Sequence, residues 1–237
     1  MPKSYTVTVD GIPVEVTHKW IRSFRLRVDK TGKAAASAPV GMPRREAERF
    51  LREHRGWLVA RVMQAQRKKE ILGNRKVADG AVRMILGEKV VLRIVEDKKK
   101  KVVREGNTVL IMTPSDNAAD WEKQYDAFYL REAKALYSEL VADYTTLVEH
   151  QESDIPKVTV RKMTSRWGSC TPEKRTIRLN YYLYEAPVFC VEYVALHEVA
   201  HLVYPDHSAR FYALIASIMP DYRERKKLLE RSVYIGE

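Results

Sequence analysis

Cysteine is scarce in this 237-residue chain, which holds only Cys170 and Cys190 and no CxxC pair. A disulfide framework is therefore excluded, and a reducing compartment fits the composition. Long apolar runs are missing too, since no stretch of about 18 apolar residues occurs, and we expect no membrane partner. The first residues lack the basic-then-apolar layout of a signal peptide, so we expect a cytoplasmic protein.

Acidic residues are outnumbered, because 42 Lys and Arg face 31 Asp and Glu, which gives a formal charge of +11. The basic residues gather in runs at 67–69, 98–101 and 223–227. Such runs are typical of solvated helix faces and turns, and also of surfaces that attract nucleic acid or acidic proteins. No zinc-finger spacing or basic motif interleaved with aromatic residues predicts a dedicated nucleic-acid module. Nucleic acid is thus a candidate partner only through the basic surface.

Hydrophobic periodicity changes along the chain. Alternating runs over residues 5–17 meet at Asp10-Gly11, a pair that accepts the positive φ angles of a tight hairpin turn. Helical spacing follows over residues 43–70, and strand-like runs then return. A long helical pattern covers residues 117–149. These patterns favour a strand-rich first half and a helix-rich second half.

The motif His197-Glu198-Val199-Ala200-His201 lies in an apolar stretch that predicts a buried helix over residues 188–204. Residues four apart on a helix differ by about 40° around its axis, so both imidazoles share one face and can bind one metal ion. Glu198 lies about 100° from His197, where it reaches a water molecule rather than the same ion. The motif therefore predicts two metal ligands and one general base.

A catalytic zinc ion needs a third protein ligand and an open fourth position. Pro205 ends the predicted helix and lets the chain return His207 towards the metal. The three histidines have the spacing of metzincin ligands, but Tyr204 stands where metzincins have glycine. Cys170 and Glu224 are the alternative third ligands. We expect one Zn²⁺ ion on His197, His201 and His207, with Glu198 as the catalytic base.

Several blocks of the sequence together resemble the YgjP-like metallopeptidases, which are also described as SprT-like or metal-dependent hydrolases. The blocks are VRKMTSRWGSC (160–170), IRLNYYL (177–183), VEYVALHEVAHLVYPDHSARFYALI (191–215) and MPDYRERKKLL (219–229). The resemblance implies a zincin-type fold, with zinc on His197, His201 and His207 and with Glu198 as the base. Asp206 departs from the Asn that is common at this position.

We therefore expect an α+β protein of two regions. Residues 1–116 form a β-rich N-terminal region with one long helix. Residues 117–237 form a zincin-like metallopeptidase region, with the HExxH helix and a small antiparallel sheet, packed on the first.

A β-hairpin is predicted around residues 168–180, because a polar turn containing proline separates two short strand-like runs. An edge strand above a metal-binding helix can pair with an extended substrate. The candidate substrate-binding residues are Arg166, Trp167, Gly168, Asn180, Tyr204 and Arg210. An alternative interpretation is structural: Trp167 packs under the helix and Arg166 pairs with a carboxylate.

These patterns favour a zinc metallopeptidase that acts on a peptide or protein. One alternative is a SprT-like protease that cleaves DNA-bound or crosslinked proteins, which would use the charge of +11. Another is a non-enzymatic binding protein that zinc stabilises.

Overall fold

The computed structural model describes residues 4–29, 31–73, 75–149 and 154–233, without the side chains of 67–73, so the basic run at 67–69 lies outside the described side chains. The chain divides into two compact units, Met1–Gly73 and Asn74–Glu237. Within the described residues, six α-helices and three small sheets make the fold mixed, which confirms the α+β class.

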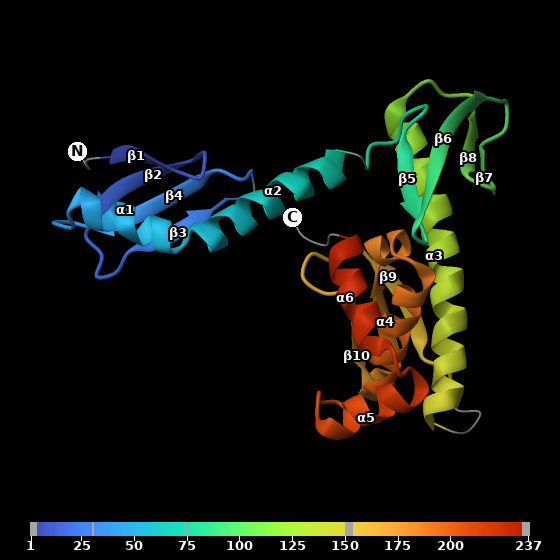
Figure 1. The fold of residues 1–237 in the computed structure, drawn as a ribbon. Helices are drawn as coiled ribbons and strands as arrows, with labels where there is room; N and C mark the ends of the chain where they lie inside the picture. Colours follow the sequence, from blue (N-terminus) through green and yellow to red (C-terminus); the bar gives the residue numbers. More distant parts are fainter. Residues whose placement is uncertain (1–3, 30, 74, 150–153, 234–237) are drawn as a thin grey trace. The chain divides into compact units, whose positions relative to one another are not determined.

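The first unit is a four-stranded sheet followed by two helices (Figure 1). Its elements are β1 (Ser4–Val9), β2 (Ile12–Lys19), β3 (Arg25–Val28), β4 (Ala34–Pro39), α1 (Arg44–Glu53) and α2 (Arg55–Gly73). The strand order is β1-β2-β4-β3, with β2 and β4 parallel. Asp10 and Gly11 join β1 to β2 with φ of 47° and 80°, which confirms the predicted hairpin.

The helical pattern after this sheet was predicted to be one long helix and forms two. His54 ends α1 with φ −97° and ψ 13°, outside helical geometry. Its carbonyl still accepts a bond from the Leu58 amide, so α2 begins at once. Leu51 and Leu58, one from each helix, are fully buried in the same cluster as the sheet residues Val14 and Val16, because both helices turn an apolar face to the strands.

The second unit begins with a sheet of the same strand order, although the sequence shows no repeat. Its strands are β5 (Val82–Ile85), β6 (Glu88–Glu96), β7 (Lys101–Glu105) and β8 (Thr108–Thr113), in the order β5-β6-β8-β7. The central pair is again parallel. Leu86 and Gly87 make the first turn, with φ of 52° and 81°, as Asp10 and Gly11 do in the first unit. The repeat is structural, since the matching positions carry different side chains.

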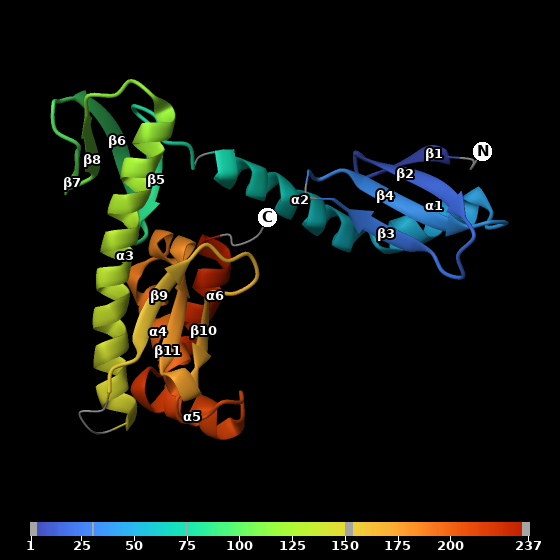
Figure 2. The same cartoon turned by 180° about the vertical axis from the view of Figure 1, so that it is seen from behind.

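The rest of the second unit packs helices against a second sheet, whose strands face the viewer in Figure 2 (Figures 1 and 2). Its elements are α3 (Ala118–Glu149), β9 (Lys157–Arg161), β10 (Gly168–Thr171), β11 (Thr176–Asn180), α4 (Val188–Ala200), α5 (Ala209–Ile218) and α6 (Tyr222–Ser232). Helix α3 contacts β7 and β8 of the first sheet and β9 of the second, and both views show it running past them. Asn117 caps α3 by accepting a hydrogen bond from the Ala119 amide.

The sheet beside α4 has the order β10-β11-β9. The predicted hairpin is confirmed, because β10 and β11 are antiparallel neighbours. The prediction of a wholly antiparallel sheet is wrong, since β9 pairs with β11 in parallel. The chain crosses from β9 to the far edge before it forms the hairpin, so β11 returns between them. This pairing is non-local, and alternation within one strand does not encode it.

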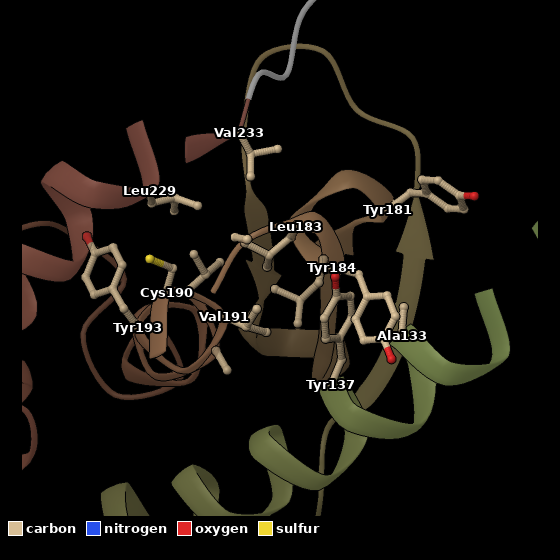
Figure 3. Packing of buried hydrophobic residues seen from close by; sticks show 14 of the residues in the cluster. Ala133, Tyr137, Tyr181, Leu183, Tyr184, Cys190, Val191, Tyr193, Leu229 and Val233 are labelled. Atoms are coloured by element: carbon tan, nitrogen blue, oxygen red, sulfur yellow. The ribbon is translucent and has the colours of Figure 1, made fainter. Parts of the chain in front are cut away.

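A single core unites the second unit. In Figure 3, Ala133 and Tyr137 of α3, Val191 of α4 and Leu229 of α6 belong to one buried cluster. Strands β6 and β8 contribute to the same cluster, so the contacts divide the chain after residue 73, whereas we expected the boundary at residue 116. Among the described residues, no helix combines the length and apolar character that a bilayer span requires.

Candidate metal centre

Helix α4 brings the HExxH motif into the core of the second unit. Most of its side chains are buried, including Val194 and Leu196 beside the motif. The helix ends at Ala200, four residues earlier than predicted, because the Leu202 and Val203 amides bond three residues back and tighten the last turn. The turn leads the chain through Pro205 to His207.

Three imidazoles converge at this turn. One ring nitrogen each of His197, His201 and His207 lie within 4.8 Å of one another. The ring centroids of His197 are 5.0 Å from those of both other histidines, and His201 and His207 are 4.7 Å apart. The Nδ1 of His201 lies 3.0 Å from the Tyr204 carbonyl, to which it donates as Nδ1–H. This bond fixes the tautomer and leaves the His201 Nε2 lone pair for a ligand.

These residues fit a tetrahedral metal ion. The Nε2 atoms of His197 and His207 are 3.1 Å apart, close to the roughly 3.3 Å between ligands of a tetrahedral ion with bonds of about 2.05 Å. Burial, and then the neighbouring imidazoles, lower the pKa of His197 to about 3. A neutral imidazole is the form that binds metal, so His197 is ready to bind a cation.

Phe211 packs against all three imidazoles. Its ring centroid lies 4.9 Å from His197, 4.6 Å from His201 and 4.9 Å from His207, and the side chain is fully buried. Ser208 begins α5 by accepting a hydrogen bond from the Phe211 amide, as predicted for a helix-capping serine. Helix α5 thus holds the three imidazole rings in position through Phe211.

Glu198 lies beside the histidines and is almost completely buried. Burial raises its pKa to about 8, although the Arg166 guanidinium acts in the opposite direction. A Cβ atom added to Gly168 would lie 2.6 Å from both Cγ and Cδ of Glu198, and in contact with Oε1. The backbone of strand β10 therefore rests directly on the carboxylate, and only glycine allows this approach.

A cleft of about 580 Å³ opens over this site. Its lining residues are Arg166, Trp167, Gly168, Ser169, Cys170, Pro172, Tyr193, Val194, His197, Glu198, His201, Pro205, His207, Tyr212, Lys226, Leu229 and Glu230. Three of the predicted substrate-binding residues, Arg166, Trp167 and Gly168, lie in this wall. The cleft is large enough for several residues of an extended peptide.

The other three predicted substrate-binding residues lie elsewhere. The side chain of Asn180 is fully buried and donates to the carbonyls of Met163 and Arg166, which fixes the loop between β9 and β10. Tyr204 and Arg210 line a separate hollow of about 650 Å³ on the outer side of the histidine turn. Tyr204 contributes to the site through its carbonyl, which accepts from His201.

The two alternative third ligands do not join the histidine cluster. Cys170 lines the cleft, but burial raises the pKa of its thiol to about 12, so it is protonated at neutral pH. Glu224 is exposed on α6 and is absent from the cluster and from the cleft lining. Within the described residues, His207 is the third potential ligand that the fold brings to the pair on α4.

Several lining residues were not predicted. Tyr193 lies four residues before His197, so helical spacing alone could have placed it on the same face. Lys226 belongs to a basic run that we interpreted as a solvated helix face, yet it lines the cleft with Tyr212 and Glu230. Helix α6 follows His197 by more than twenty residues, so no local pattern places it over the histidines.

Comparison with known proteins agrees with the geometry. A search of the curated proteins found no match. The model of the YgjP-like metallopeptidase domain matches residues 22–232, nearly the whole chain. This match supports a metal-dependent peptidase in general, and the histidine cluster is consistent with its metal. The chain belongs to the YgjP-like metallopeptidase family.

Proposed function

We propose that this protein is a zinc-dependent metallopeptidase that holds one zinc ion on His197, His201 and His207 and uses Glu198 as its general base. The observation that carries the proposal is the convergence of three imidazoles beside a buried carboxylate, at the floor of an open cleft. Three imidazole ligands favour zinc among the common divalent ions, and the open cleft leaves room for a fourth ligand.

When bound, the ion would act as a Lewis acid that polarises a carbonyl and acidifies water. The Glu198 carboxylate accepts the proton of the attacking water and passes it to the departing amine. Its burial excludes bulk water and raises its proton affinity, which suits a group that must hold and release a proton. The guanidinium of Arg166, close enough to stabilise the charged carboxylate, favours the form that accepts the proton.

The substrate backbone is proposed to pair with strand β10. This strand lies at the edge of its sheet, and Gly168, Ser169 and Cys170 line the cleft. A strand edge offers unpaired amides and carbonyls to an extended peptide. Because β10 rests on Glu198, a peptide added there would pass beside the base and the imidazoles, in a zincin-like arrangement.

Replacement of Glu198 by Gln tests this role. The variant keeps the shape of the side chain and all three imidazoles, so we expect unchanged metal content and a fall in peptide cleavage of about 10²–10⁴-fold. Metal analysis and digestion of an unfolded protein substrate measure the two quantities. Full cleavage by the variant would contradict the proposal. If even the wild-type protein cleaves nothing but unfolds on chelation, a non-enzymatic, zinc-stabilised binding protein is favoured instead.

A second candidate is a protease that acts on proteins bound to nucleic acid. The first unit has 16 Lys and Arg against 7 Asp and Glu, a formal charge of +9, whereas the second unit has 26 against 24. Exposed Arg25 and Arg27 lie on the edge strand β3, and the nearby Trp20 is 92% exposed. Cationic and aromatic side chains together are suited to single-stranded nucleic acid.

Oligonucleotide binding tests this second candidate. We expect salt-sensitive binding that weakens when Arg25 and Arg27 are both replaced by Glu. The same charge change at Lys98 and Lys99, in the second unit, serves as the matched control. If both double substitutions weakened oligonucleotide binding equally, the effect would depend on net charge alone. The nucleic-acid site would then not be assigned to the first unit.

A further inference from the structure

A second hollow adjoins the cleft along helix α6. It has a volume of about 490 Å³ and is lined by Tyr212, Tyr222, Arg223, Lys226, Lys227 and Glu230. Tyr212, Lys226 and Glu230 line both cavities. The hollow therefore extends the cleft along α6, and its lining includes no residue of strand β10.

This hollow, which we call the α6 hollow, is cationic. Arg223, Lys226 and Lys227 face it against the single carboxylate of Glu230. In the described part of the chain, none of the three cations lies within ion-pair distance of a carboxylate. Arg225, between them in sequence, differs because it pairs with Glu192 and Asp221. Arg223, Lys226 and Lys227 therefore line the hollow without a carboxylate partner among the described residues, so they can bind an anionic ligand.

Lys226 is exposed, although it lies on the same face of α6 as two buried residues. On α6 it follows Tyr222 by four residues and precedes Leu229 by three, and both of these are buried. The three residues share one helix face, which Lys226 interrupts at the junction of the cleft and the hollow. Its exposed side chain lines both cavities.

Aromatic rings form the remaining wall of the hollow. Tyr222 stacks at 6.0 Å on Tyr212 and at 6.5 Å on Tyr193, and Tyr212 stacks at 6.1 Å on His207. This row of rings runs from the metal centre to the α6 hollow. Tyr193 and Tyr222 are buried in this row, and the half-buried Tyr212 lines both cavities.

We propose that the α6 hollow is a specificity subsite, in which Lys226 binds a carboxylate of the peptide substrate, an acidic side chain close to the bond to be cleaved. The proposal rests on the proposed peptidase function. Arg223 and Lys227 extend this preference from one acidic residue to a run of them. Glu230 supplies the single carboxylate of the lining, so it opposes the attraction at one position. A charge-assisted hydrogen bond from Lys226, together with the charges of Arg223 and Lys227, should raise the affinity for an acidic peptide about tenfold.

Peptide binding to the metal-loaded Glu198→Gln variant tests the proposal without catalysis. The probes are two fluorescein-labelled peptides of otherwise identical sequence. One carries a block of glutamates, and the other carries lysines at the same positions. We expect the glutamate peptide to bind about tenfold more tightly. Adding Lys226→Glu should abolish or reverse this preference. Adding Lys134→Glu, the same charge change at an exposed site on α3 outside both cavities, should preserve it.

Equal binding of the two peptides, or a preference that survives Lys226→Glu, would overturn the proposal. Inorganic pyrophosphate tests a phosphate ligand. If it displaces the labelled acidic peptide at a concentration far below that needed with unlabelled acidic peptide, the hollow binds phosphate groups and the proposal is overturned as well. Cleavage assays separate this result from the proposed function. If the glutamate peptide binds more tightly but the wild-type protein cleaves no substrate, only the proposed peptidase function is contradicted. If the wild-type protein cleaves substrate but shows no preference for the glutamate peptide, only the proposed subsite is contradicted.

Discussion

Gly168 sets how closely strand β10 approaches the HExxH helix. Its missing side chain lets the strand rest on Glu198, which buries the carboxylate and keeps it beside the imidazoles. Gly168 was among the candidate substrate-binding residues chosen from the sequence. The structure brings its backbone against Glu198, which is possible because it has no side chain.

Replacing Gly168 by Ala is expected to destabilise the protein by about 1–3 kcal/mol, because the new Cβ overlaps Glu198 and forces one of the two to move. Peptide cleavage should fall by more than tenfold as the base is displaced. Thermal unfolding and a cleavage assay measure both effects. Gly56→Ala is the control, since a Cβ at Gly56 meets nothing within 4 Å. An alanine variant at 168 with normal activity would show that the strand can retreat freely.

At the scale of elements, the loop between β9 and β10 carries Arg166 and Trp167 into the cleft wall. Asn180, at the end of β11, fixes this loop through two hydrogen bonds from its amide nitrogen, of 2.8 Å to the Met163 carbonyl and 2.9 Å to that of Arg166. Its Oδ1 accepts from the Tyr182 amide. One buried side chain thus joins the end of the central strand to a wall of the active-site cleft.

Asn180→Ala should lower the free energy of unfolding by about 1–3 kcal/mol, because a fully buried side chain loses its hydrogen bonds to two backbone carbonyls. We also expect a higher KM with a smaller change in kcat, since the loop and not the base is disturbed. Asn107→Ala, at an exposed turn, should stay within about 0.5 kcal/mol of the wild type. If Asn180→Ala lowered kcat alone, with normal stability, a direct role in the reaction would be indicated.

At the scale of the whole molecule, the second unit contains every residue of the cleft and a continuous core from Val77 to Val233. A chain that begins at residue 74 should therefore fold and bind metal. A chain that begins at residue 117 should not, because it exposes the α3 face that packs on β7 and β8. Circular dichroism and metal analysis distinguish the two. If both chains folded equally well, the result would support the boundary at residue 116 that we expected from the sequence.

Local patterns in the sequence were sufficient for the centre of the site but not for its walls. Helical spacing places His197 and His201 on one face, and Pro205 accounts for the return of His207. Lys226 enters the cleft from another helix, and β9 joins the sheet by non-local parallel pairing. Such contacts are set by packing of the whole unit, which spacing along one segment does not encode.

The metal content of the purified protein tests the central claim most directly. Wild-type protein and a His54→Ala control, which alters an exposed histidine of the first unit, should each hold about one zinc ion per chain, as a three-histidine site requires. The His207→Ala variant should lose most of its zinc after dialysis. Zinc retained in full by His207→Ala, or absent from wild-type protein prepared with zinc, would contradict the account.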